Sequence, residues 1–122
     1  MSAGVILTGA TAWGQIPIPT APAAQDGGTL FRNQCATCHA LDPADPPRQG
    51  PLLEGVVGRK PGSVPGFHYT AGYGTANFVW DDGDLDKYLT NPQAMFPGSI
   101  MVYRQANPDV RRRIIAYLRE QG

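Results

Sequence analysis

Hydrophobic side chains recur at helical spacing near the end of the chain. Four of them share one stripe of a helix: Val110, Ile114, Tyr117 and Leu118. A helix start precedes this stripe, because Asn107 can cap the helix, Pro108 fits its first turn and Asp109 places an acidic side chain near its positive end. The pattern predicts an amphipathic helix that begins at Asn107, with the arginine run 111–113 on a solvated face.

Two further helices are indicated on either side of a long central segment. The first covers about residues 28–35, and the second runs from a cap at Asp81-Asp82 to Leu89, where Pro92 stops it. Fifteen glycines and twelve prolines in 122 residues indicate long loops elsewhere. A chain of this length forms one small domain, whose hydrophobic core is marginal without further support.

The first 26 residues differ in composition from the rest of the chain. They are apolar at Val5-Ile6-Leu7, proline-rich from Ile16 to Pro22, and contain no basic residue. A secretory signal peptide would begin with a positive segment, and the apolar run is too short to span a bilayer. We expect residues 1–26 to form a proline-rich N-terminal extension on the surface of a domain of residues 27–122. A membrane anchor or a partner-docking segment is the alternative.

The clearest chemistry in the sequence belongs to the run Cys35-Ala36-Thr37-Cys38-His39. A C-x-x-C-H motif is the pattern of covalent haem attachment: two thiols bond to the vinyl groups of one porphyrin, and the adjacent histidine ligates the iron. Three other interpretations stay open from the motif alone. A thioredoxin-like dithiol would need a βαβ pattern, a zinc site would need two more ligands although only His68 is left, and a disulfide would leave the histidine unexplained.

A second axial ligand decides what such a haem can do. Methionine thioether is the usual partner of histidine in a low-spin electron carrier, and it raises the reduction potential. Of the three methionines, Met1 is terminal. Met101 follows the rigid Pro97-Gly98 turn and can be presented to the iron from a loop. We therefore expect Met101 to be the ligand in preference to Met95.

Beyond these motifs, the chain resembles the class I c-type cytochromes, the family of mitochondrial cytochrome c and its soluble bacterial relatives. The resemblance runs from Gly27 through Tyr117, about three quarters of the sequence. Besides the haem motif and Met101, it rests on short segments spread over this range: Gly27, Phe31, Gly50-Pro51, Gly58-Arg59, Pro65-Gly66-Phe67, Tyr69-Thr70, Trp80, Tyr88-Leu89, Asn91-Pro92, Pro97-Gly98-Ser99 and Tyr117-Leu118.

This resemblance implies an all-α class I cytochrome c fold, with about three main helices and long loops wrapped around one covalently bound haem. The haem c would be attached through Cys35 and Cys38. His39 and Met101 would ligate the iron, and the carbonyl of Pro51 would fix the far ring nitrogen of the histidine.

The resemblance also assigns a second group of residues around the haem. Arg59, Tyr69 and Trp80 fall at positions that surround a haem propionate, a carboxylate that must be paired or hydrogen-bonded inside a protein. Tyr88 matches a tyrosine beside the methionine ligand, and Ser99 stands where a threonine hydroxyl helps to hold the loop. The set expected to bind the cofactor is therefore Cys35, Cys38, His39, Pro51, Arg59, Tyr69, Trp80, Tyr88, Ser99 and Met101.

Departures from the family pattern concern the redox partner and the loop that carries Met101. Family members with mitochondrial-type partners carry a lysine before the methionine ligand and a collar of lysines, whereas this chain has Ile100 and only Lys60 and Lys87. Because the formal net charge is zero, we do not expect a partner held by long-range attraction to a basic face. Ile100 also predicts that methionine loss needs higher pH or another ligand. Tyr73, in place of a small amide, predicts an altered polar network near Met101.

The predicted function is one-electron transfer rather than enzymatic catalysis, with the iron cycling between ferric and ferrous while both axial ligands stay bound. Expected partners are redox proteins such as a dehydrogenase, a cytochrome complex or a terminal oxidase, and not nucleic acid. Membrane contact is expected only through partners or the N-terminal segment, and the chain is expected to be a monomer. Its predicted location is the bacterial periplasm, with the mitochondrial intermembrane space as the alternative. A haem c subunit or domain of a larger dehydrogenase complex and a haem peroxidase are the alternative functions.

Overall fold

The computed structural model describes residues 2–5, 9 and 25–122, and the regular secondary structure within these ranges is entirely helical. The elements follow one another in the order α1 (Gly27–Gln34), η1 (Tyr73–Thr75, a 3-10 turn), α2 (Asp82–Thr90), α3 (Pro92–Met95) and α4 (Pro108–Arg119). Long loops connect them, above all between α1 and η1. The three predicted helices correspond to α1, α2 and α4, so the all-α fold is confirmed.

Side-chain caps determine where α2 and α4 begin. The Asp81 carboxylate accepts a hydrogen bond from the backbone N–H of Asp84 at 2.7 Å, and the side-chain oxygen of Asn107 accepts one from the N–H of Asp109 at 2.9 Å. Each bond satisfies an amide that has no partner within its helix. α2 ends just before Pro92, as predicted, but this proline also starts α3, because its ring is preorganised for the first turn of a helix.

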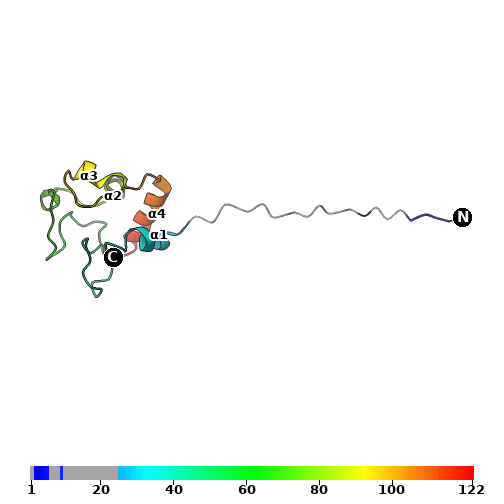
Figure 1. Cartoon of the computed structure of the whole chain (residues 1–122), viewed down its shortest axis with the longest axis horizontal. Coiled ribbons are helices and arrows are strands. Elements are labelled where there is room, and N and C mark those ends of the chain that lie inside the picture. The colour runs from blue at the N-terminus through cyan, green and yellow to red at the C-terminus, as the bar shows by residue number, and fades with distance from the viewer. Residues whose placement is uncertain (1, 6–8, 10–24) are drawn as a thin grey trace.

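α4 lies against α1, and their crossing is a central part of the hydrophobic core (Figure 1). Ile114 is completely buried, and the rings of Phe31 and Tyr117 have centroids 5.5 Å apart. A methyl group at Gly27 would collide with the carbonyl oxygen of Arg113 and lie 2.8 Å from the Cβ of Tyr117. The close approach of the two helices therefore requires a glycine at this position.

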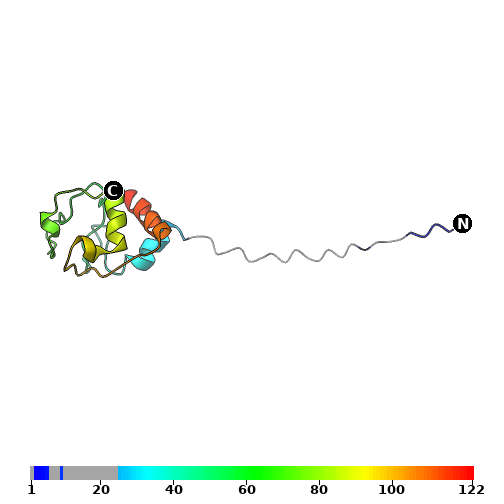
Figure 2. The same ribbon diagram turned by 90° about the horizontal axis from the view of Figure 1, so that it is seen from above.

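α4 also lies against α2, as Figure 2 shows. At this contact the Arg111 side chain is only 11% exposed, and its Nε donates to an Asp86 carboxylate oxygen at 2.7 Å. Its Nη1 also donates to the backbone oxygen of Gln105. The predicted solvated face holds for Arg112, which is 72% exposed, but is wrong for Arg111. Arg111 faces a neighbouring helix that supplies a carboxylate, so its charge is paired rather than hydrated.

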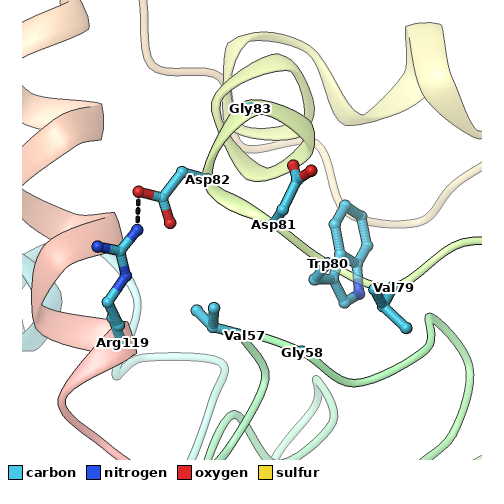
Figure 3. A pocket seen from close by; sticks show the side chains of 8 residues that line it. All are labelled: Val57, Gly58, Val79, Trp80, Asp81, Asp82, Gly83 and Arg119. Atoms are coloured by element: carbon cyan, nitrogen blue, oxygen red, sulfur yellow. Dashed lines mark hydrogen bonds and ion pairs between the residues drawn. The ribbon is translucent and has the colours of Figure 1, made fainter.

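A shallow surface concavity lies where the end of α4 approaches the start of α2 (Figure 3). Arg119 donates across it to the Asp82 carboxylate, and the other side is bordered by Val57 and Trp80. The ion pair links α2 and α4 at the surface. None of the expected iron ligands lines this concavity.

The buried core draws on α1, α2, α4 and the intervening loops. Its members are Leu30, Phe31, Val56, Trp80, Leu85, Leu89, Phe96, Ile114, Ile115 and Leu118. Half-buried aromatic and thioether side chains pack against this core, among them Tyr73, Phe78, Tyr88, Met95, Met101 and Tyr103. These residues include several members of the candidate site.

Most of the predicted N-terminal extension lies outside the described residues. The expectations of an extended arm, a membrane anchor or a docking segment concern residues 1–26, of which the structure describes residues 2–5, 9, 25 and 26. In the part of the chain that is described, no helix combines the length and the apolar composition needed to cross a membrane.

Candidate functional site

The Cys-x-x-Cys-His motif directly follows α1 and is folded into tight turns. Cys35 ends the helix, and its carbonyl oxygen accepts hydrogen bonds from the N–H groups of Cys38 and His39, both at 3.0 Å. Arg48, which sequence analysis did not single out, donates to the backbone oxygens of Ala36 and His39. These bonds fix the backbone that carries two thiols and an imidazole within five residues.

No disulfide joins the two cysteines of the motif. Burial, followed by the proximity of Cys38, raises the pKa of Cys35 to about 11. Thioredoxin-like redox chemistry needs a thiolate of low pKa, so the environment of Cys35 argues against that interpretation of the motif.

The His39 imidazole is oriented by the residue that the family resemblance assigns to this role. Its Nδ1 lies 2.7 Å from the carbonyl oxygen of Pro51, which can only accept, so Nδ1 carries the proton. Burial lowers the pKa of His39, although this hydrogen bond acts in the opposite direction. The ring is therefore neutral at neutral pH, and the lone pair on Nε2 is available for a metal. Gly50 packs directly beneath the ring, since a Cβ there would lie 2.7 Å from both ring nitrogens.

Met101, the second ligand candidate, is held by hydrogen bonds at both its sulfur and its backbone. The Tyr88 hydroxyl donates to its Sδ at 3.2 Å, and its own N–H donates to Ser99 Oγ at 3.2 Å. The preceding turn depends on Gly98, whose φ of 86° lies in the left-handed region. Burial raises the pKa of Tyr88 far above its usual range, so its phenol remains a proton donor at physiological pH.

Tyr73 in η1 is a member of the site that sequence analysis singled out only as a departure from the family pattern. Its hydroxyl lies 2.7 Å from the Tyr88 hydroxyl and 2.6 Å from Ser99 Oγ. Its ring stacks on Phe96 with centroids 4.1 Å apart. The polar network near Met101 thus contains a second tyrosine.

Arg59, Tyr69 and Trp80, the residues assigned to a propionate, lie close together. The backbone N–H of Trp80 donates to the backbone carbonyl of Arg59 at 2.9 Å. The half-buried Arg59 guanidinium donates to the backbone oxygens of Leu52 and Glu54; burial lowers its pKa, while nearby Tyr69 raises it. Among the described residues, no carboxylate forms an ion pair with Arg59. This guanidinium can therefore take an additional anionic partner.

The chemistry of these side chains fits a covalently attached haem c. The two motif cysteines form no disulfide, one imidazole is neutral with an available Nε2, one thioether is fixed on a loop, and one half-buried guanidinium pairs with no carboxylate of the described residues. These are the groups needed for attachment, axial ligation and propionate binding. His68, by contrast, is exposed on a loop.

Comparison with known proteins agrees with this geometry. The family model for cytochrome c matches residues 24–122 of the chain. Cytochrome c2 of Rhodomicrobium vannielii is 44% identical over 96 residues, which cover 78% of this chain and 76% of that protein. Cytochrome c of Sesamum indicum is 37% identical over 97 residues (79% and 87%), and cytochrome c type-1 of Ascaris suum is 36% identical over 98 residues (80% and 87%). The chain therefore belongs to the class I cytochrome c family, whose members are one-electron carriers with covalently bound haem c.

Proposed function

We propose that this protein carries single electrons between redox proteins, with His39 and Met101 as permanent axial ligands of the haem iron. The observation that supports this most strongly is that each ligand candidate is held by a directed hydrogen bond, from His39 Nδ1 to the Pro51 carbonyl and from the Tyr88 hydroxyl to Met101 Sδ. Bonds of this kind set the orientation and the basicity of a metal ligand. With both axial positions filled, no open position is left for a substrate, which favours a carrier over a peroxidase.

Haem c supplies the redox centre, an iron that takes up or gives up one electron. The chain holds and insulates this centre. Cys35 and Cys38 would form the two thioether attachments, and Arg59, Tyr69 and Trp80 would pair with or hydrogen-bond a propionate. Because the same hydrogen bonds can hold both axial ligands in either oxidation state, little rearrangement of the protein accompanies electron transfer.

The proposed location is the bacterial periplasm, where residues 27–122 would act as a monomeric cytochrome domain behind an N-terminal extension of residues 1–26. The likeness to a bacterial cytochrome c2 and the low lysine content support this location over the mitochondrial intermembrane space. The partners would be a periplasmic dehydrogenase, a cytochrome complex or a terminal oxidase.

The two residues that flank Met101 are apolar. Ile100 is 69% exposed and Val102 is 73% exposed, and neither neighbour of Met101 carries a charge. Contacts between apolar surfaces are not screened by salt, unlike those between charges. We expect the rate of electron transfer to an oxidase, or from a dehydrogenase, to change by less than about threefold between low and physiological ionic strength. Stopped-flow mixing with each purified partner measures this rate.

A steep dependence on salt, of about tenfold or more over the same range, would show that docking relies on charge and would reject the apolar docking face. Slow exchange with every redox partner at both ionic strengths would contradict the carrier function itself. The two results therefore separate the mode of docking from the function.

A lysine at position 100 is expected to create an alkaline ligand switch that the native chain lacks. Ile100 adjoins Met101 and is largely exposed, so a deprotonated amine there can replace the thioether. The Ile100→Lys variant should lose methionine ligation about one pH unit or more below the native protein. Ile100→Gln is the matched control, because it is polar but has no amine. Absorption titration of the ferric proteins measures the midpoints, and lysine ligation of the native protein at mildly alkaline pH would reject this expectation.

A further inference from the structure

Hydrogen bonds around the ligand loop, residues 97–101, form a closed ring that begins and ends on Met101. The Met101 amide nitrogen lies 3.2 Å from Ser99 Oγ, and that oxygen lies 2.6 Å from the Tyr73 hydroxyl. The Tyr73 hydroxyl lies 2.7 Å from the Tyr88 hydroxyl, which lies 3.2 Å from Met101 Sδ. The ring joins η1, α2 and the ligand loop, so a single residue is bound through both its backbone and its sulfur.

The chemistry of the groups at Met101 fixes the direction of every bond in the ring. The Met101 N–H can only donate, so Ser99 Oγ accepts there, and the thioether can only accept, so Tyr88 donates its single proton to Sδ. The Tyr88 oxygen then accepts from Tyr73, which has no proton left for Ser99. Ser99 must therefore donate to the Tyr73 oxygen. Each hydroxyl donates once and accepts once within the ring, which is the arrangement in which hydrogen bonds strengthen one another.

Packing holds the aromatic rings of this network independently of their hydroxyl groups. The Tyr73 ring stacks on buried Phe96 with an interplanar angle of 16°, and the Tyr88 ring meets Phe96 edge-on with centroids 6.0 Å apart. Ser99 is 4% exposed, and its carbonyl accepts a hydrogen bond from Gln93 Nε2 at 3.2 Å. Removal of the Tyr73 oxygen alone should therefore leave the packing in place.

We propose that Tyr73 is a positioning residue that strengthens the hydrogen bond from Tyr88 to the Met101 sulfur and thereby raises the reduction potential. This inference rests on the proposed ligation of the iron by Met101. A hydrogen bond to the thioether withdraws electron density from it, which destabilises ferric iron more than ferrous iron. Without Tyr73, the Tyr88 oxygen loses the donor that polarises it, so the hydrogen bond from Tyr88 to the sulfur weakens.

The test compares the reduction potentials of the native holoprotein, Tyr73→Phe, Tyr88→Phe and the double variant. Tyr73→Phe should shift the equilibrium toward ferric iron by about threefold, which is about 28 mV at 59 mV per tenfold change for one electron. In the double variant, the loss of the Tyr73 hydroxyl should add nothing to the loss of the Tyr88 hydroxyl, because the hydrogen bond that it strengthens is already gone. The Met–iron charge-transfer band of the ferric protein should persist in all variants.

Tyr117→Phe is the matched control, because it removes a tyrosine hydroxyl from α4 that is not part of the ring, and it should leave the potential unchanged. Ser99→Ala opens the ring at another bond and should lower the potential as well. An unchanged potential in Tyr73→Phe, additive shifts in the double variant, or loss of the Met–iron band in Tyr73→Phe would each overturn the inference. Absence of that band from the native protein would instead overturn ligation by Met101, so the two failures are distinguishable.

Discussion

Replacing Met101 with leucine is expected to lower the reduction potential by about 0.1 V or more and to open the iron to added ligands. Leucine is close to methionine in volume, so the loop should keep its packing while the thioether is lost. The effect is large because axial ligands set haem potentials over a range of roughly 0.8 V, and methionine raises the potential. Potentiometric titration of the haem-loaded variant measures the shift, and imidazole binding measures the opening of the iron.

Met95→Leu is the matched control for this experiment. Met95 ends α3 and packs, half-buried, against the same hydrophobic core. The substitution removes a thioether without touching the proposed ligand, so the potential and the rate of imidazole binding should stay native. A native potential in Met101→Leu, or a large fall in Met95→Leu, would contradict the assignment of the ligand.

The Gly50→Ala variant is expected to destabilise the holoprotein by about 2 to 3 kcal/mol, because it overpacks the histidine ligand. The added Cβ would lie 2.7 Å from both ring nitrogens of His39 and closer still to Cε1. The ring cannot simply turn away, because its Nδ1 is bonded to Pro51 and its Nε2 is proposed to bind the iron. The Gly50 backbone is also fixed, since its N–H donates to the Cys38 carbonyl at 2.6 Å. Denaturant unfolding followed by haem absorption measures the loss of stability.

Gly74→Ala provides the comparison for this prediction. Like Gly50, Gly74 has a φ outside the left-handed region, but a Cβ there would meet no atom within 4 Å. This substitution should leave stability within about 1 kcal/mol of native, the usual range for the conformational effect alone. If the two alanine variants unfolded at the same denaturant concentration, the close packing of Gly50 against the imidazole would have no energetic importance.

The helices and the haem motif could be predicted from the sequence because the interactions that define them are local. The caps at Asp81 and Asn107 act on amides two or three residues further along the chain. The attachment motif occupies five consecutive residues, Cys35 to His39. The bond from His39 to Pro51 spans twelve residues, and only the family resemblance indicated it in advance.

Contacts between distant elements were beyond sequence analysis. Tyr73 forms hydrogen bonds with Tyr88 and Ser99, which are 15 and 26 residues away. The sequence indicated only that a tyrosine at position 73 departs from the family pattern. Arg111 was assigned to a solvated face, because helical periodicity does not indicate that the helix carrying Asp86 packs beside it. Both cases depend on how helices and loops meet in three dimensions rather than on any local pattern.

The central claim is that Met101 fills the second axial position of the iron, as an electron carrier requires. The absorption spectrum of the ferric holoprotein at neutral pH tests this claim most directly. We predict a Met–iron charge-transfer band in the native protein and in Met95→Leu, and its loss in Met101→Leu. A native spectrum without this band would contradict permanent methionine ligation and would favour an iron open to substrates, as a peroxidase requires.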